Sequence, residues 1–211
     1  AEDVTQGIDL TGKNIVITGI NSGLGQESMR VLSSRGAHII GTARTLEKAQ
    51  AAASQIDGNV TPLACELSDF KSVQQCAKAI LSLNIPIDVL LCNAGIMALP
   101  KLELAQGYEL QFTTNHLGHF ILAHTLIDAV KRAKQGRIVM LSSLAHKMAP
   151  KGGIAFDNLD GSLGYKDWSF YGQSKLANLL TAVSLAKRLD GSNATANAVH
   201  PGIIRTNLSR S

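Results

Sequence analysis

The chain of 211 residues is poor in aromatic and charged residues and has no long uninterrupted hydrophobic run. Aromatic residues make up 4% and charged residues 17% of the sequence, while hydrophobic residues reach 45%. This balance is typical of a folded globular protein and excludes a disordered one. The longest apolar stretch, residues 85–98, is interrupted by Asp88, Asn93 and Gly95, so we expect no transmembrane segment.

Cysteine is also scarce. The three cysteines, Cys65, Cys76 and Cys92, are an odd number without a pairing motif, which is typical of a reducing compartment. Residues 1–9 are polar and acidic and do not resemble a secretory leader. We therefore expect a cytoplasmic or comparable reducing interior location.

The net charge of +4 is too small to indicate a nucleic-acid partner. The one basic cluster contains Lys131, Arg132, Lys134 and Arg137. It falls where a predicted helix ends, and cations there complement the helix dipole. We expect no binding of DNA or RNA.

Three histidines lie close together in sequence but do not indicate a metal site. His116, His119 and His124 have no carboxylate or cysteine partner at ligand spacing. We expect them to face the core or the solvent, and we expect no metal.

Short apolar runs alternate with helical stretches along the chain. The expected strands are 14–18, 37–42, Val60–Ala64, 87–91, 137–141 and 196–199. The expected helices are 26–34, 45–56, 69–83, 107–134 and 168–189, and the glycine-rich segment 149–165 is expected to be a long loop. This alternation predicts an α/β fold, a doubly wound parallel sheet with helices on both faces (Rossmann-type). Without a repeat or linker, residues 1–211 are expected to form a single domain.

A glycine-rich turn follows the first predicted strand. In residues 14–25 an apolar run opens directly into Gly19-Ile20-Asn21-Ser22-Gly23-Leu24-Gly25, and a helical stretch follows. Such a turn brings the backbone close to a pyrophosphate, and the helix N-terminus attracts the anion. The pattern indicates a dinucleotide site, although a strand-to-helix turn without a ligand would read the same way.

Tyr171 and Lys175 are one helical turn apart, on one helix face. A tyrosine has a pKa near about 10, and a nearby ammonium lowers it toward the working range of an acid or base. The other tyrosines, Tyr108 and Tyr165, have no lysine four residues on. Alone, the pair would also fit two surface residues.

Several motifs occur in a fixed order. The cofactor turn reads Thr18-Gly19-x-x-x-Gly23-x-Gly25, and Asn93-Ala94-Gly95 follows the fourth predicted strand. Asn115 lies in the central helix, Ser142-Ser143 closes the fifth strand and Pro201-Gly202 follows the sixth. In these features the chain resembles the short-chain dehydrogenase/reductase family over nearly its whole length. Residues 115–120, 143–146 and 174–178 most resemble its retinol-dehydrogenase-like branch.

The resemblance implies a catalytic group of Asn115, Ser143, Tyr171 and Lys175. Tyr171 would exchange a proton with the substrate oxygen, and Ser143 would donate a hydrogen bond to it. Lys175 would hold the nicotinamide ribose, and Asn115 would hold a water that links Lys175 to solvent. From the residues alone, Ser143 would also suit a backbone cap and Asn115 a buried amide.

The resemblance also implies an NAD(P)-binding domain over residues 1–211. The implied cofactor-binding residues are Gly19, Asn21, Ser22, Gly23, Leu24, Gly25, Arg44, Glu66, Leu67, Asn93, Ala94, Gly95, Tyr171, Lys175, Pro201, Gly202 and Thr206. Ala43 stands where NAD-dependent members carry an acid, and the next residue, Arg44, suits a 2′-phosphate. NADP(H) is therefore favoured over NAD(H), although Arg44 would also suit an exposed helix start. Glu66 departs from the family's usual aspartate near the adenine.

The implied function is an NADP(H)-dependent oxidoreductase that interconverts an alcohol and a carbonyl on a small apolar substrate. Ile96, Met97, Leu144 and Met148 are expected to line the pocket. Family members normally continue beyond the equivalent of Ser211, so we expect part of the C-terminal region to be missing from this chain. The alternative is an NADP(H)-binding regulatory or scaffolding protein with little turnover. An epimerase or dehydratase is disfavoured by the glycine spacing, and the family's usual interfaces, here 107–134 and 168–189, leave a homo-oligomer open.

Overall fold

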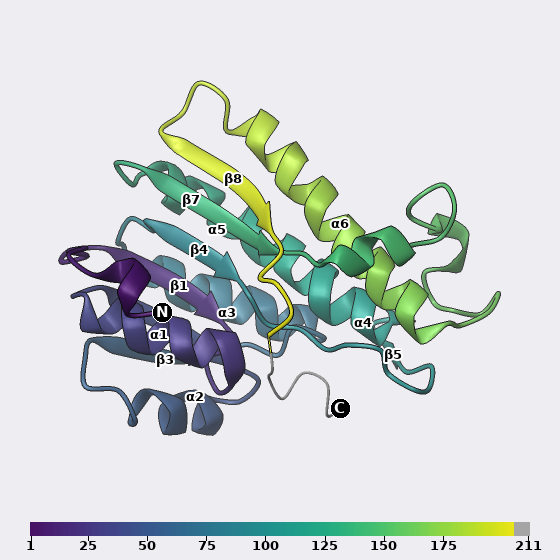
Figure 1. Cartoon of the computed structure of the whole chain (residues 1–211), viewed down its shortest axis with the longest axis horizontal. Helices are drawn as coiled ribbons and strands as arrows, with labels where there is room; N and C mark the ends of the chain where they lie inside the picture. The colour runs from purple at the N-terminus through teal and green to yellow at the C-terminus, as the bar shows by residue number, and fades with distance from the viewer. Residues whose placement is uncertain (205–211) are drawn as a thin grey trace.

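Six parallel strands form the central sheet of the structure, a computed structural model that describes residues 1–204 (Figure 1). Their spatial order is β3-β2-β1-β4-β7-β8. The strands are β1 (Asn14–Thr18), β2 (His38–Ala43), β3 (Val60–Ala64), β4 (Val89–Cys92), β7 (Gly136–Leu141) and β8 (Ala194–Val199). The chain starts near the middle and winds outward in both directions, which is the order of a Rossmann-type sheet. The predicted fold class is confirmed.

Helices cover both faces of this sheet (Figure 1). They are α1 (Gly23–Ser34), α2 (Leu46–Ala53), α3 (Phe70–Ser82), α5 (Gly118–Lys131) and α6 (Asp167–Arg188). On one face, Met29 of α1 and Ala49 of α2 pack in a cluster with Ile17 of β1. On the other face, α3, α5 and α6 pack around Leu90 and Ile138. Fully burying one such Ile or Leu contributes roughly 2 kcal/mol, so the two clusters hold the strand ends rigidly.

The strand register brings segments that are distant in sequence to one edge of the sheet. Thr18 at the end of β1 pairs with Thr42, and its neighbour Ile17 pairs with Leu91 of β4. Met140 of β7 pairs with Cys92. The loops that follow β1, β2, β4 and β7 therefore emerge side by side. The predicted motifs lie on or beside these loops or on the helices behind them, except for Pro201-Gly202, which follows β8.

The predicted helix 107–134 is wrong at its N-terminal end. Strands β5 (Leu104–Ala105) and β6 (Tyr108–Glu109) form a small antiparallel hairpin there. Gln106 and Gly107, with φ of 55° and 82°, form its two-residue turn, and positive φ at both positions is typical of a type I′ turn. The helical path starts only at α4 (Leu110–Phe112), passes through a π-helical turn, η2 (Thr113–Leu117), and continues as α5.

The other predicted elements differ from the structure by a few residues at their ends. Thr45 and Asp69 are N-caps rather than helical residues, since their side chains accept hydrogen bonds from the Lys48 and Lys71 N–H groups. The predicted loop 149–165 contains only a short 3-10 helix, η4 (Phe156–Asn158). A second one, η3 (Leu144–Met148), precedes it, and a third, η1 (Asp3–Thr5), lies near the N-terminus.

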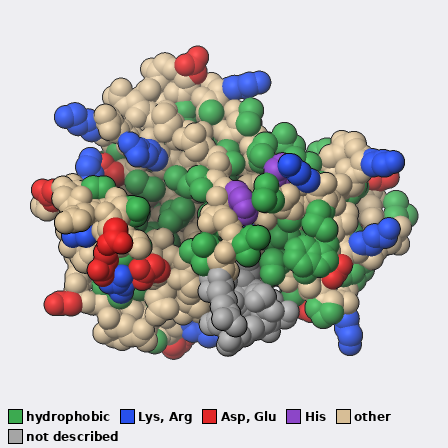
Figure 2. All heavy atoms as spheres, viewed as in Figure 1, with side chains coloured by type: hydrophobic (Ala, Val, Ile, Leu, Met, Phe, Trp, Pro, Cys, Tyr) green, Lys and Arg blue, Asp and Glu red, His purple; other side chains and the backbone are tan. Residues whose placement is uncertain are grey.

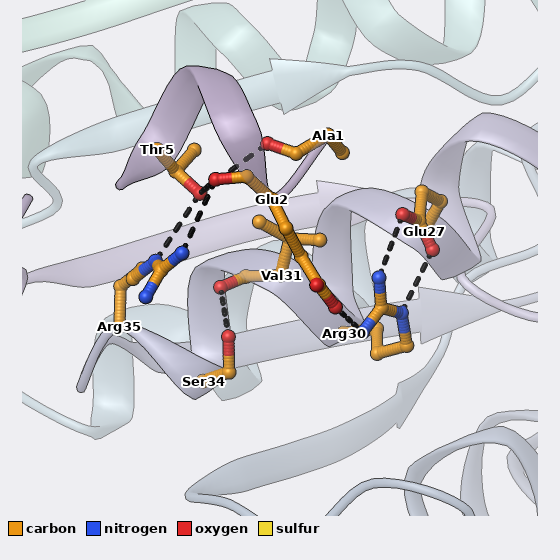
Figure 3. A network of polar contacts seen from close by, with 8 residues as sticks. All are labelled: Ala1, Glu2, Thr5, Glu27, Arg30, Val31, Ser34 and Arg35. Carbon is orange, nitrogen blue, oxygen red and sulfur yellow. Dashed lines mark hydrogen bonds and ion pairs between the residues drawn. The ribbon is translucent and has the colours of Figure 1, made fainter. Parts of the chain in front are cut away.

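The N-terminal segment is bound to α1 by two arginines of that helix and its C-cap (Figure 3). Arg30 donates to both carboxylate oxygens of Glu27, each at 2.9 Å, and to Glu2 Oε1 at 2.7 Å. Arg35 donates to the Thr5 hydroxyl and the Glu2 carbonyl, both at 3.2 Å. Because these groups are largely exposed, we expect each ion pair to contribute at most about 1 kcal/mol.

Candidate active site

A cleft of about 270 Å³ lies at the carboxyl ends of the central strands. The predicted cofactor-binding residues that line it are Gly19, Asn21, Ser22, Gly23, Leu24, Arg44, Glu66, Leu67, Asn93, Ala94 and Gly95. It is also lined by Thr42, Ala43, Cys65, Ile96, Thr114 and Leu141, which were not among them. The loops after β1, β2, β3 and β4 thus share one cleft, as expected for a ligand site in this type of sheet.

The glycine turn after β1 leaves room for a pyrophosphate. Gly19 has a φ of 76°, a conformation that favours glycine. A Cβ on Gly25 would collide with the Gly19 carbonyl oxygen and lie 2.6 Å from the Asn93 side-chain nitrogen. The Ser22 side chain does not cap α1, so the first N–H groups of this helix are left for an anion. These features fit a dinucleotide, which Gly19, Ser22 and Gly23 would hold through its phosphates.

Arg44 and Glu66 form an ion pair beside the cleft. Arg44 Nε lies 3.3 Å from Glu66 Oε2, and 64% of the arginine side chain is exposed. The other carboxylate oxygen of Glu66 accepts hydrogen bonds from the Ser68 hydroxyl at 2.8 Å and the Ser68 N–H at 3.1 Å. Glu66 is therefore fixed, and it turns toward Arg44. Arg44 makes this ion pair through Nε, which leaves its two terminal nitrogens for a phosphate.

Thr18 links the glycine turn to the loop after β4. Its hydroxyl accepts hydrogen bonds from the N–H groups of Asn93 at 2.9 Å and Ala94 at 3.0 Å. The same oxygen lies 2.8 Å from His119 Nε2, and His119 Nδ1 lies 2.9 Å from the Asn115 carbonyl oxygen. Since a carbonyl only accepts, Nδ1 carries the ring proton, and Thr18 donates its hydrogen to Nε2. Burial lowers the pKa of His119 to about 4, so this ring is neutral.

The two serines after β7 point to different groups. Ser142 is buried and donates to the Lys175 carbonyl oxygen at 2.8 Å, so its hydroxyl serves the backbone of α6. Ser143 is half-buried, and its side chain lies close enough to Tyr171 to lower the pKa of the phenol. It also accepts from the Ala145 N–H at 3.1 Å. Of the two, Ser143 is the one next to the tyrosine hydroxyl.

Tyr171 and Lys175 lie on one face of α6, with the ammonium 5.6 Å from the centre of the tyrosine ring. The expected lowering of the tyrosine pKa is not observed. Burial raises the pKa of Tyr171, and the nearby Ser143 hydroxyl offsets this rise only in part. Burial also lowers the pKa of Lys175 to about 8. Both shifts have one cause: each charged form loses hydration in the core, and this exceeds the attraction between the two groups.

Asn115 is fully buried in the π-helical turn η2. Its side chain accepts from the Ile96 N–H at 2.8 Å and donates to the Ile96 carbonyl at 2.9 Å and the Ser174 hydroxyl at 3.0 Å. Its own carbonyl accepts from His119 and from Asn178 Nδ2, the latter at 3.0 Å. These bonds use both amide hydrogens and both carbonyl lone pairs. Asn115 thus holds the backbone of Ile96, as expected for the alternative of a buried amide. Its role in holding a water for Lys175 stays a prediction.

Of the predicted cofactor-binding residues that the structure describes, Gly25, Tyr171, Lys175, Pro201 and Gly202 do not line the cleft. Pro201 is half-buried and Gly202 is exposed, both just beyond β8. Thr206 lies outside the described residues. The polar residues His119 and Asn178 were not predicted as part of the site. A sequence signal for both existed, since His119 is four residues after Asn115 and Asn178 is three after Lys175, each on the face of its partner.

A second hollow lies near Tyr171 and has one apolar side and one polar side. Trp168 packs edge-on against the Tyr171 ring, with centroids 6.0 Å apart. Trp168, Met148 and Pro100 line this hollow together with Tyr165 and the polar residues of 166–169. Of the four expected lining residues, Met148 lies here and Ile96 lines the main cleft, whereas Leu144 is exposed. Met97 is half-buried and lines neither hollow.

Hydrophobic side chains are also grouped on the outside of the molecule near this hollow. In the space-filling view they gather on the right-hand part of the face shown, with Lys or Arg side chains at their border (Figure 2). Between residues 144 and 168, which include the hollow's Met148 and Trp168, the large exposed apolar residues are Leu144, Met148, Phe156, Leu163 and Trp168. In residues 1–204, no helix combines the length and the hydrophobicity needed to cross a bilayer.

Comparisons with known proteins agree with this geometry. Residues 13–157 match the family model described as short chain dehydrogenase. Short-chain dehydrogenase TIC 32 B, chloroplastic, from Brassica napus is 43% identical over 100% of this chain and 69% of its own length. Retinol dehydrogenase 11 from Homo sapiens is 41% identical over 98% of this chain and 65% of its own length. The chain thus spans about two thirds of these relatives.

Solved structures show the same fold. An uncharacterised protein from Mycobacterium paratuberculosis superposes with a TM-score of 0.83 at 39% identity, over 96% of this chain and 72% of its own. A metagenomic short-chain oxidoreductase in complex with NADP superposes with a TM-score of 0.73 at 28% identity, over 92% and 84%. The cleft, the motifs and these relatives, a retinol dehydrogenase among them, lead to one conclusion. The chain belongs to the short-chain dehydrogenase family of NAD(P)-dependent oxidoreductases.

Proposed function

We propose that this chain is an NADP(H)-dependent oxidoreductase that interconverts an alcohol and a carbonyl on an apolar substrate. One observation carries the proposal: a buried tyrosine, Tyr171, lies close to the Ser143 hydroxyl and shares a helix face with Lys175, whose ammonium bonds to the carbonyl of Leu141 in the cleft wall. A proton donor beside a hydride donor is the arrangement that carbonyl reduction requires.

The nicotinamide cofactor, when bound, supplies or accepts the hydride. During reduction Tyr171 gives its phenol proton to the substrate oxygen. Ser143 donates a hydrogen bond to the same oxygen and stabilises the charge that develops on it. Lys175 turns its ammonium toward the cofactor ribose and favours the phenolate that remains.

In the resting protein Tyr171 is in the protonated form that reduction uses. The raised pKa of Tyr171 keeps the phenol protonated at neutral pH, and Lys175, with a pKa of about 8, is mostly charged there. A protonated phenol can donate at once, whereas oxidation needs the phenolate as a base.

An apolar substrate is supported by the hollow beside Tyr171. The aromatic and aliphatic side chains of Trp168, Met148 and Pro100 offer few hydrogen-bond partners. A ligand with a hydrocarbon body and one carbonyl would bury its apolar part there and present its oxygen to Ser143. The retinol dehydrogenases among the relatives are consistent with a substrate of this class.

The preference for NADP(H) rests on Arg44. Its guanidinium lines the cleft, Ala43 precedes it in place of an acid, and one solved relative is in complex with NADP. A planar fork of donors binds a phosphate in two places.

All three cysteines are free thiols, which supports a reducing interior compartment for the protein.

Turnover is tested by following NADPH consumption with a panel of retinoid, steroid and aliphatic carbonyls. We expect reduction of at least one apolar carbonyl, and Tyr171→Phe should lower kcat at least about a hundredfold because the proton donor is lost. Tyr108→Phe, at a half-exposed tyrosine in the β5–β6 hairpin, is the matched control and should be fully active. Tight NADPH binding without turnover of any carbonyl would support the regulatory or scaffolding alternative.

Cofactor preference is tested by measuring the Kd for NADPH and for NADH. Arg44→Ala should weaken NADPH binding about tenfold and change NADH binding little, since only NADPH carries the 2′-phosphate. Arg188→Ala, at the far end of α6, removes the same charge away from the cleft and should change neither value. Equal losses for both cofactors in Arg44→Ala would contradict the role given to this residue.

A further inference from the structure

Asn178 is a buried amide on the same face of α6 as Tyr171 and Lys175. It lies seven residues after the tyrosine and three after the lysine, and only 1% of it is exposed. Its Nδ2 donates to the Leu141 carbonyl at 3.0 Å and to the Asn115 carbonyl at 3.0 Å. With a carbonyl acceptor for each hydrogen, the orientation of this amide is fixed.

The other end of the amide is also held. Asn178 Oδ1 lies 3.2 Å from His116 Nδ1, and since the amide oxygen only accepts, the imidazole donates. Burial lowers the pKa of His116 to about 4, so the ring is neutral. Asn178 is thus tied to β7 through Leu141 and to the π-helical turn η2 through Asn115 and His116.

Lys175 shares one of these acceptors. Its Nζ donates to the Leu141 carbonyl at 3.2 Å, the long end of the range for such a bond. Leu141 lines the cleft, so this carbonyl marks the position from which the ammonium would leave to reach a ligand. If Lys175 were needed there as a donor, its departure would strip a hydrogen bond from a buried carbonyl.

We propose that Asn178 is a positioning residue for Lys175: its amide keeps the Leu141 carbonyl hydrogen-bonded, so that the ammonium can exchange this carbonyl for a ligand in the cleft at low cost. The inference rests on the proposed function in that the ligand is a dinucleotide ribose. Without Asn178, the Leu141 carbonyl would depend on the Lys175 ammonium for this hydrogen bond. With Asn178 as a second donor, the ammonium can turn away from this carbonyl.

The charges around Lys175 make its pKa a direct measure of this arrangement. The buried titratable groups around it are Tyr171 on α6, His116 on η2 and His119 on α5, and all three are neutral at pH 7. Two other elements packed against α6 carry titratable groups nearer the surface: half-buried His146 and exposed Lys147 on η3, and exposed Arg137 on β7. Burial is the cause of the lowered lysine pKa of about 8. The dipole of the Asn178 amide offsets the Leu141 and Asn115 carbonyl dipoles, and without it both carbonyls would favour the ammonium more strongly.

The test follows the titration of Lys175 by NMR in protein carrying [ε-13C]lysine, without added cofactor. The resonance is assigned by its loss in Lys175→Met. We expect a pKa of about 8 in the wild type, rising to about 9 or above in Asn178→Leu, which removes both donors at similar volume. Asn178→Ala also removes both donors and adds no charge, so it should raise the pKa in the same direction, and it decides the question if Asn178→Leu does not fold.

Thr181→Val is the matched control, at a buried polar residue three positions further along the same helix. It should leave the Lys175 pKa unchanged. An unchanged pKa in folded Asn178→Leu or Asn178→Ala would overturn the proposal and leave Asn178 a structural amide. Where turnover is found, Asn178→Leu should lower kcat about tenfold with little change in KM. A wild type without turnover would defeat the proposed function, while the NMR titration would still decide the role of Asn178.

Discussion

Replacing Lys175 by methionine should stabilise the fold while it removes turnover. Lys175 is only 3% exposed, and burial lowers its pKa from 10.5 to about 8. At about 1.4 kcal/mol per pKa unit, keeping this ammonium in the folded protein costs about 3 kcal/mol below pH 8. Methionine has a similar length and no charge. It loses the hydrogen bond to Leu141, worth about 1 kcal/mol, so the free energy of unfolding should rise by about 2 kcal/mol at pH 7.

This gain depends on pH in a defined direction. Between pH 8 and 10.5 the folded protein binds fewer protons at Lys175 than the unfolded chain, because its pKa is the lower one. The wild-type stability therefore rises with pH in this window, relative to the variant. The advantage of Lys175→Met should be full below pH 8, shrink above it and be lost before pH 10.5, where only the missing hydrogen bond to Leu141 still separates the two proteins.

Urea unfolding at pH 7 and pH 10 measures both effects, and NADPH consumption measures turnover. Lys187→Met changes an exposed lysine on the same helix and serves as the control, with no expected pH-dependent difference from the wild type. If Lys175→Met were less stable than the wild type at pH 7, or if its advantage did not narrow at pH 10, the burial cost assigned to this ammonium would be refuted. A stabilised but inactive variant would show that the protein retains Lys175 for function at the expense of stability.

Two further substitutions test the framework of the cleft. Gly25→Ala places a Cβ against the Gly19 carbonyl and the Asn93 side chain. We expect the free energy of unfolding in urea to fall by about 2 kcal/mol and NADPH binding, measured by calorimetry, to weaken at least about tenfold. Wild-type affinity would contradict a close approach of the backbone to the phosphates. His119→Phe leaves the buried Thr18 hydroxyl without its acceptor, so unfolding free energy should fall by about 1–3 kcal/mol, whereas an unchanged value would show that this bond contributes little.

The fold could be predicted from local pattern because its elements are typical of their class. Each strand is a short apolar run, and each helix begins near a recognisable cap or glycine, such as Thr45 before α2. The error at residues 107–109 has a local cause. Gly107 was taken as the start of a helix, although the pair Gln106-Gly107 is also compatible with a hairpin turn, and only the pairing of Ala105 with Tyr108 decides between them.

The cleft was predictable for a different reason. Residues that follow parallel strands must meet at one edge of the sheet, so placing Gly19, Arg44 and Asn93 after their strands was enough to bring them together. Side-chain partners inside the site were not predictable in this way. The Arg44–Glu66 ion pair joins loops after two strands, and its formation depends on how far each side chain reaches.

The pKa of Tyr171 illustrates why spacing alone does not fix chemistry. Two charged or polar groups on one helix face attract each other only as strongly as their surroundings allow, and here α6 buries both against β7. Burial acts on the two groups in opposite directions, raising the pKa of the phenol and lowering that of the ammonium, so each is pushed toward its neutral form. The sequence contains the pair but not the burial. In the resting site the Tyr171 phenol is therefore neutral, and the Lys175 ammonium beside it destabilises the fold. This ammonium donates a hydrogen bond to the Leu141 carbonyl, which also accepts one from Asn178.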